Sequence, residues 1–182
     1  MKASEYVILV DILDNEIGFS EKLFAHRHNL LHRAFSLFIF RKTHQFELLL
    51  QQRALTKYHS SGLWSNTCCS HPRVQETILA AGQRRLSEEL NISAAQLQNL
   101  GWFHYNVDFF NGLTENEIDH VLFGLVSADT RVIPNSVEVN DYRWVTLTHL
   151  EYEMDVYPNQ FTPWLKQALN IVKRFSGLIN KV

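Results

Sequence analysis

The segment WSNTCCSHP, residues 64–72, places two adjacent cysteines just before a histidine. Neighbouring cysteines form only rare, strained disulfides, and two thiols are too few for a four-cysteine zinc site. Cys68 and Cys69 are therefore expected to be free thiols, and the ordinary role of each is that of a small buried apolar side chain. Because the chain has nine histidines in all, the next question is which residues accompany His71.

Histidines and glutamates elsewhere have the residue types that bind transition metals. Three histidines lie within residues 26–32, and TENEID, residues 114–119, holds two glutamates separated by one residue. If TENEID enters a strand, Glu115 and Glu117 project from one face, because strand side chains alternate. Two such carboxylates repel each other unless a proton or cation lies between them, and imidazole with carboxylate suits a divalent transition metal. The spacing matches no standard zinc motif, and a histidine taken alone is more often a surface or hydrogen-bonded residue.

A third group of candidate residues is basic, and its members are Lys22, Arg53, Lys57, Arg84 and Arg85. Most cations on a protein surface are simply solvated. Gathered in one place, these would suit a phosphate or diphosphate, because Arg offers a planar fork of donors and Lys a point charge. Arg84 and Arg85 also stand four residues before Glu88 and Glu89, and exposed pairs of this kind contribute only about 0.2–0.5 kcal/mol.

The elements that must position these residues follow from periodicity. Residues 33–53 predict two strands around the polar turn KTHQ, and further strands are expected at 100–110, 118–127 and 141–145. Residues 76–90 predict a helix whose apolar seam is Ile78, Gly82, Leu86 and Leu90. A last helix is expected after Thr162 as N-cap, with an apolar face of Trp164, Ala168, Val172 and Phe175, and Gly177 as its stop. The mixture favours an α/β (α+β) fold, a mixed sheet covered by helices.

Length and composition limit the function classes. The 182 residues predict one domain, 1–182, and no internal repeat or linker divides them. The net charge of −2 gives no basic field for nucleic acid. No apolar run is long enough to span a bilayer, and no secretory signal is visible. We therefore expect a cytoplasmic protein without nucleic-acid or membrane partners; its oligomeric state is open, with a monomer favoured.

Several segments together resemble type I isopentenyl-diphosphate isomerases, a family of the Nudix superfamily. The most specific are LHRAFS within residues 21–36 and NTCCSHP within residues 64–72. The supporting ones are QRALTK (52–57), RRLSEEL (84–90), TENE (114–117) and PW (163–164). The matching segments lie between about residue 7 and about residue 165, and they follow one another in the same order as in the family. It implies a Nudix-like mixed β-sheet sandwiched between helices.

The resemblance also implies roles for individual residues. The reacting groups would be Cys69 and Glu117, with Tyr105 and Trp164 lining the reacting end. One divalent metal (Mn, Zn or Mg) would be held by His26, His32, His71, Glu115 and Glu117, and the spacing leaves His28 as a substitute for His26. A magnesium ion bound to the substrate diphosphate would contact Glu89 and the backbone carbonyl of Cys69. The diphosphate oxygens would meet Lys22, Arg53, Lys57 and Arg85. Cys68 receives no role beyond packing.

The implied activity is the interconversion of isopentenyl diphosphate and dimethylallyl diphosphate in isoprenoid biosynthesis, with a small-molecule diphosphate as the partner. Where Nudix hydrolases carry a glutamate after the helix arginine, this chain has Arg85, and Ser70 and Asn91 replace two glycines. This departure disfavours a diphosphohydrolase, the first alternative. A thiol hydrolase using Cys69 with a nearby histidine is the second alternative. A non-catalytic metal-binding module is the third.

Overall fold

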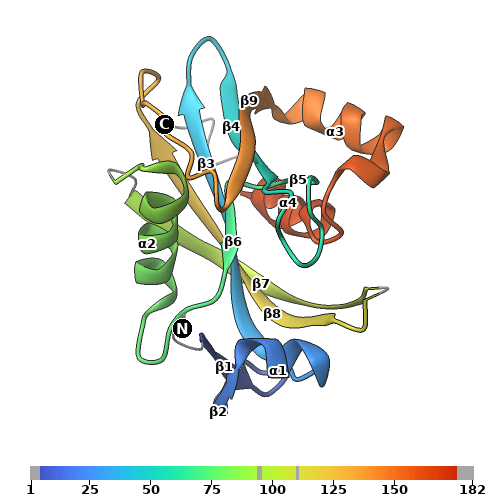
Figure 1. Ribbon diagram of the computed structural model, residues 1–182. Helices are drawn as coiled ribbons and strands as arrows, with labels where there is room; N and C mark the ends of the chain where they lie inside the picture. The colour runs from blue at the N-terminus through green and yellow to red at the C-terminus, as the bar shows by residue number, and fades with distance from the viewer. Residues whose placement is uncertain (1–4, 94–95, 110, 176–182) are drawn as a thin grey trace.

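A computed structural model describes residues 5–93, 96–109 and 111–175 (Figure 1). The helices are α1 (Lys22–Arg27), α2 (Ile78–Leu90), α3 (Leu147–Val156) and α4 (Leu165–Arg174), with a short 3-10 turn at Pro158–Gln160. The strands are β1 (Tyr6–Val10), β2 (Glu16–Glu21), β3 (His32–Lys42), β4 (Phe46–Arg53), β5 (Trp64–Ser65), β6 (Cys68–Ser70), β7 (Gln96–Asp108), β8 (Thr114–Val126) and β9 (Val139–Thr146). Within these residues, no helix is long and apolar enough to cross a membrane.

Strand β3 is the centre of a mixed sheet. It pairs antiparallel with β1, β4 and β6 and parallel with β8, while β7 adds to β8 and β9 to β4. Its side chains alternate between two apolar clusters: Leu37 and Ile39 pack with α2, and Phe38 and Phe40 pack with α3 and α4. Figure 1 shows α2 on one side of β3 and the pair α3 and α4 on the other. The predicted fold, a mixed sheet between helices, is confirmed.

Helix α2 forms where its apolar seam predicted it. Ala81, Gly82, Leu86 and Leu90 are its buried apolar positions, and Ile78 packs against the same cluster. The helix begins at Ile78, two residues later than predicted, because the Thr77 hydroxyl accepts a hydrogen bond from the Ala80 amide at 3.2 Å and so caps it. It ends at Leu90, and the next residue, Asn91, has a φ of 56°, the left-handed conformation usual after a helix.

The packing of α2 gives a testable stability difference between two leucines of that helix. Leu86 is fully buried, whereas Leu79 is 40% exposed. Leu86→Ala is expected to lower the free energy of unfolding by about 2–5 kcal/mol, because it removes buried methyl groups and leaves a cavity. Urea denaturation measures this change, and Leu79→Ala is the matched control, with an expected change under about 1 kcal/mol. Equal losses in the two variants would contradict this packing.

The other predicted elements are present with different bounds. The strands predicted at 100–110, 118–127 and 141–145 overlap β7, β8 and β9, all of which begin earlier than predicted. β7 ends at Asp108 and β8 at Val126, before the predicted ends, whereas β9 continues to Thr146. Thr162 as N-cap is wrong: α4 is capped at Trp164, and the Thr162 hydroxyl is instead 3.1 Å from the Ser65 hydroxyl. Gly177 lies outside the described residues. Helices α1 and α3 and strands β1, β2, β5 and β6 were not predicted, because α1, β5 and β6 are very short and the other three lack a clear apolar period.

Candidate active site

Strand register places the candidate residues in one row. The parallel pairing of β3 with β8 sets His32 beside Glu117, and the pairing of β7 with β8 sets Tyr105 on the other side of Glu117. The pairing of β3 with β6 sets Ser36 beside Cys69. Because alternate residues of a strand share a face, His32 and Ser36 project together. The thiol of Cys69 and the carboxylate of Glu117 therefore lie on the same face of the sheet.

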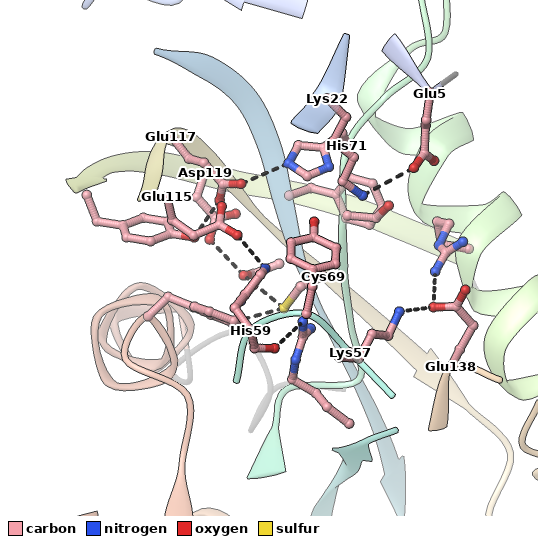
Figure 2. Close-up of a pocket in the computed structure, with 18 of the residues that line it drawn as sticks. Glu5, Lys22, Lys57, His59, Cys69, His71, Glu115, Glu117, Asp119 and Glu138 are labelled. Atoms are coloured by element: carbon pink, nitrogen blue, oxygen red, sulfur yellow. Dashed lines mark hydrogen bonds and ion pairs between the residues drawn. The ribbon is translucent and has the colours of Figure 1, made fainter. Parts of the chain in front are cut away.

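A cavity of about 320 Å³ opens on this face, and both Cys69 and Glu117 line it (Figure 2). Tyr105 and Trp164 also line it, with ring centroids 6.2 Å apart. The Tyr105 hydroxyl donates to Glu117 Oε2 at 2.5 Å. The volume is at the small end of the range for ligand pockets, roughly 300–1,000 Å³. The four residues predicted at the reacting end are thus brought into one cavity.

Three histidines and a glutamate converge beside this cavity. One ligand atom from each of His26, His32, His71 and Glu115 lies within 4.8 Å of the others. Helix α1 supplies His26, whose Nδ1–H donates to the Thr114 carbonyl at 2.9 Å. His32 donates from Nδ1 to the Leu30 carbonyl at 2.7 Å. Each imidazole is thereby fixed so that its Nε2 presents a lone pair, as metal-ligating histidines require.

Unpartnered atoms show that this cluster fits a divalent cation. His26 Nε2 and Glu115 Oε2 are buried and have no hydrogen-bond partner. His32 Nε2 lies 3.2 Å from His71 Nε2 and 3.3 Å from Glu117 Oε1. Buried atoms that carry lone pairs are costly to group unless a proton or cation lies among them. Burial lowers the pKa of His26 to about 4 and that of His71 to about 3, so both rings are neutral at pH 7, the form that binds a metal.

His28 is not part of this cluster. Its Nδ1–H donates back to the Phe24 carbonyl at 2.9 Å, and its exposed ring stacks on that of Phe24 at 3.8 Å. Lys22 and His26 stand four residues apart on α1, so they share a face of the helix. The geometry therefore favours His26 over His28 as the ligand from this segment.

The carboxylates of β8 have opposite pKa shifts. Burial and the charge of Glu117 raise the pKa of Glu115 and of Asp119 well above their usual values. Burial alone would also raise the pKa of Glu117, but the close contacts of the His32 and His71 rings with its carboxylate outweigh it and hold that pKa well below its usual value. Three carboxyl groups on one face cannot all ionise without a cation, so the histidines select Glu117 as the ionised one.

The thiol of Cys69 is surrounded by neutral hydrogen-bonding groups. It donates to Asn66 Oδ1 at 2.9 Å and accepts from the Trp164 indole at 3.1 Å. The hydroxyls of Ser36 and Ser65 each lie 3.6 Å from the sulfur. Burial, with the charge of Asp119, raises the pKa of Cys69 to about 12. The group is therefore a protonated thiol at neutral pH rather than a thiolate.

Cys68 points the other way. It is fully buried in the apolar cluster beneath α2, because successive residues of β6 project from opposite faces. Both cysteines are free thiols, as predicted.

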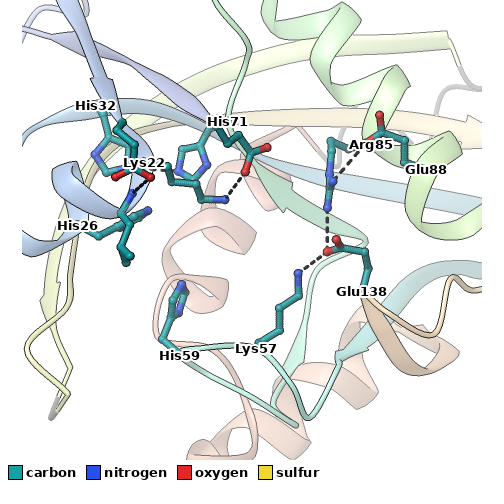
Figure 3. A network of polar contacts seen from close by, with 12 residues as sticks. Lys22, His26, His32, Lys57, His59, His71, Arg85, Glu88 and Glu138 are labelled. Carbon is teal, nitrogen blue, oxygen red and sulfur yellow. Dashed lines mark hydrogen bonds and ion pairs between the residues drawn. The ribbon is translucent and has the colours of Figure 1, made fainter. Parts of the chain in front are cut away.

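The four predicted diphosphate ligands all line the cavity; they are Lys22, Arg53, Lys57 and Arg85. Figure 3 shows Lys22 beside His26 and His71, and Lys57 and Arg85 on either side of Glu138. Two acidic residues hold three of these cations: Lys22 Nζ is 3.2 Å from Glu5, while Lys57 and Arg85 both contact Glu138, the latter at 3.0 Å. Burial would raise the pKa of Glu138, but Lys57 and Arg85 outweigh burial and lower that pKa to about 2, so Glu138 is ionised. The four cations therefore have the charge and the geometry to bind an anion that displaces the carboxylates of Glu5 and Glu138.

Glu89 lies behind Arg85 instead of on the cavity wall. Its Oε1 accepts from Arg85 at 2.9 Å and its Oε2 from Gln51 at 3.0 Å. The two helix pairs predicted from spacing, Arg84 with Glu88 and Arg85 with Glu89, are both present. Glu89 itself is only 3% exposed, so the pair of Arg85 with Glu89 is buried, whereas the spacing indicated an exposed pair.

Sequence reasoning missed several residues of the site. Asp119 completes the alternation of TENEID and accepts from the Ser36 hydroxyl at 2.7 Å; the same period that selected Glu115 and Glu117 would have found it. His59 lies 2.7 Å from Glu115 Oε1, and burial lowers its pKa to about 3. Nothing in the local sequence pointed to His59, nor to Glu5 and Glu138.

Comparison with known proteins places the chain in a family. The NUDIX domain model matches residues 30–165. Isopentenyl-diphosphate Delta-isomerase of Photobacterium profundum is 47% identical over 94% of this chain and 96% of its own length. Isopentenyl-diphosphate Delta-isomerase 1 of Aromatoleum aromaticum is 46% identical over 92% of each chain.

Solved structures agree on the fold. A Deinococcus radiodurans protein superposes with a TM-score of 0.73 at 20% identity, covering 93% of this chain and 98% of that one. An Ap4A hydrolase of Caenorhabditis elegans superposes with a TM-score of 0.58 at 18% identity, covering 80% and 97%. At these identities the likeness shows a shared fold alone. The family match and the curated relatives show more: this chain belongs to the type I isopentenyl-diphosphate Delta-isomerase family of the Nudix superfamily.

Proposed function

We propose that this protein interconverts isopentenyl diphosphate and dimethylallyl diphosphate. One carbon of the allylic unit gains a proton and another loses one, through a tertiary carbocation. The observation that carries the proposal is that a neutral thiol, Cys69, and an ionised carboxylate, Glu117, line the same cavity as four cations. The names of the curated relatives support the same reaction.

The cations fix the substrate by its charged end. The diphosphate oxygens are bound by Lys22, Arg53, Lys57 and Arg85. Before substrate arrives, Glu5 pairs with Lys22, and Glu138 pairs with Lys57 and Arg85. Binding energy from this remote group holds the alkene between the thiol and the carboxylate. A magnesium ion bound to the diphosphate would be held by Glu89 and the Cys69 carbonyl as further oxygen ligands. Glu89 would then have to give up part of its contact with Arg85.

The proton transfers involve the two groups on the cavity wall. The Cys69 S–H stands on one side, with its sulfur held by Asn66 and Trp164. Glu117, held by His71 at 2.8 Å and by Tyr105, stands on the other side. A pair of proton-transfer groups on opposite faces of an allylic unit serves both directions of the reaction.

The carbocation needs protection from nucleophiles. Trp164 is only 3% exposed and offers an aromatic face, which stabilises a cation by about 2 kcal/mol in a dry site without forming a bond. Water would trap the cation as an alcohol, so the buried walls of the cavity matter as much as its charges.

The His/Glu cluster supports Glu117. His26, His32, His71, Glu115 and Glu117 would hold a divalent cation of the zinc, manganese or magnesium type. When bound, the ion supplies a fixed positive charge that sets the proton affinity of the carboxylate. The histidines then act through placement and electrostatics.

His32→Ala is expected to lose the bound metal. The ring lies fully buried with Nε2 inside the cluster, so its removal deletes a ligand and leaves a void. Elemental analysis of the purified variant should show less than about a tenth of the wild-type metal content. His149→Ala is the control, because His149 is exposed on α3. Wild-type metal content in His32→Ala would contradict the ligand set.

Product analysis separates this proposal from the hydrolase alternative. Purified protein incubated with isopentenyl diphosphate should give dimethylallyl diphosphate, seen as new allylic signals by proton NMR, without release of phosphate. Phosphate release from nucleoside diphosphate compounds, with no allylic product, would overturn the assignment in favour of a diphosphohydrolase.

A further inference from the structure

His59 has a buried side chain that lines the active-site cavity. It has no role in the proton transfers or in diphosphate binding. It lies in the loop that joins β4 to β5, and only 6% of its side chain is exposed. Its ring stacks on Phe109 with centroids 4.8 Å apart, and its Nε2 lies 2.7 Å from Glu115 Oε1. Figure 2 shows the ring reaching across the cavity to Glu115.

The contacts of the His59 ring identify which nitrogen carries the proton. The Ser60 hydroxyl lies 3.4 Å from Nδ1 and can donate to it. Nε2 then bears the hydrogen and donates to Glu115 Oε1, an acceptor. His59 is thus a donor to a carboxylate, the usual arrangement behind a metal ligand.

The two oxygens of Glu115 are used differently. Oε1 is taken by His59, whereas Oε2 is buried, has no hydrogen-bond partner and lies 3.7 Å from His26 Nδ1. A carboxylate anchored through one oxygen has its other oxygen fixed in direction. His59 therefore leaves Oε2 as the free oxygen of a carboxylate that has a ligand atom within 4.8 Å of those of the three histidines.

The loop that carries His59 also carries a diphosphate ligand. Lys57 stands two residues earlier and points to the other side of the cavity (Figure 3). The loop is held further by Arg53, which donates to the His59 carbonyl at 3.3 Å, and by Asn111, which donates to the Tyr58 carbonyl at 2.8 Å. One short segment thus connects the metal cluster to the anion-binding cations.

We propose that His59 is a positioning residue for Glu115 and that it couples occupation of the His/Glu site to ordering of the loop at residues 54–62. The inference rests on the metal site of the proposed function. Coupling of this kind is reciprocal, so an ion that holds Glu115 in place strengthens the anchor of the loop, and an anchored loop strengthens ion binding. The ion thereby helps to place Lys57 for the diphosphate.

Metal affinity is the first test and needs no substrate. Zn²⁺ binding is measured by competition with a chromophoric chelator. His59→Ala is expected to bind Zn²⁺ about 10–100-fold more weakly than wild type, the usual effect of losing a partner of a ligand. His59→Gln keeps a side-chain N–H donor and should recover most of the affinity. His44→Ala, in the exposed turn after β3, is the control. Wild-type affinity in His59→Ala would overturn the proposal.

A second measurement separates positioning from direct ligation. Co²⁺ in the site gives visible bands that report the ligand set. His59→Ala loaded with Co²⁺ should keep the wild-type bands, because the ligands themselves are unchanged. A spectrum that shows a different coordination number would make His59 a ligand and overturn its assignment as a positioning residue.

Hydrogen exchange tests the coupling to the loop. In wild type, Zn²⁺ should slow amide exchange in peptides covering residues 54–62, and in His59→Ala this protection should be lost. Peptides from α2 serve as the internal reference. Equal protection by Zn²⁺ in both proteins would overturn the coupling. None of these three measurements depends on isomerisation, so an inactive protein with these metal effects would contradict the proposed function alone.

Discussion

Cys69→Ala is expected to reduce turnover of isopentenyl diphosphate by about 10²–10⁴-fold, the usual contribution of a positioned proton-transfer group. The thiol lies in the cavity, and no other described thiol does. Affinity for the diphosphate should stay within a few-fold of wild type, because the four cations, and not the thiol, would hold its oxygens. Steady-state kinetics and calorimetric titration with dimethylallyl diphosphate measure the two effects separately.

The neighbouring cysteine provides a matched control. Cys68 is fully buried beneath α2, on the opposite face of β6. Cys68→Ala removes a thiol of the same size one residue away, and it should change the rate by less than about threefold while costing roughly 1–2 kcal/mol of stability. Comparable loss of rate in both variants, or full activity of Cys69→Ala, would remove the thiol from the mechanism.

Glu117→Gln should have an effect of similar or greater size. The amide keeps the shape of the side chain but cannot act as the ionised proton acceptor. Glu117 also lies 2.8 Å from His71 and 3.3 Å from His32, so the variant should bind the metal more weakly. Turnover is expected to fall by at least about 10³-fold. Rates measured with saturating metal separate loss of proton transfer from loss of the ion.

A glutamate on the surface of α2 controls for the charge change. Glu88 has a side chain that is 38% exposed and pairs with Arg84 and Arg85. Glu88→Gln removes one charge near the site without touching the cavity wall, and it should leave the rate within about twofold. If Glu117→Gln retained more than about a tenth of wild-type turnover with metal bound, Glu117 would be acting only as a ligand.

The elements that carry the site were predictable because their patterns are local. The strong β-formers before and after KTHQ became β3 and β4, and the apolar seam at 76–90 became α2. The alternation of TENEID correctly placed Glu115 and Glu117 on one face. Thr162 shows the limit of local reasoning: a threonine before a proline is a common cap pattern, but its hydroxyl is used by Ser65.

The assembly of the site was not predictable from pattern alone. His32 meets Glu117 because β3 and β8 pair in parallel, and no short-range signal sets that register. His59 reaches Glu115 from a loop whose path depends on the packing of its ring on Phe109. The spacing alone left Glu89 on an exposed ion-paired face, whereas the resemblance implied a magnesium ligand; its burial follows from how α2 lies on the sheet. The resemblance to a family, and not the periodicity, brought His32, Glu117 and Glu89 together, and it did not point to His59.

The central claim is that a thiol and a carboxylate in one cavity move protons at opposite ends of an allylic unit. Incubation with isopentenyl diphosphate in heavy water, followed by mass spectrometry and NMR of the product, tests it most directly. We expect dimethylallyl diphosphate with deuterium in the methyl group formed by protonation, and no deuterium incorporation with Cys69→Ala. Dimethylallyl diphosphate formed without deuterium, or no allylic product at all, would contradict the account.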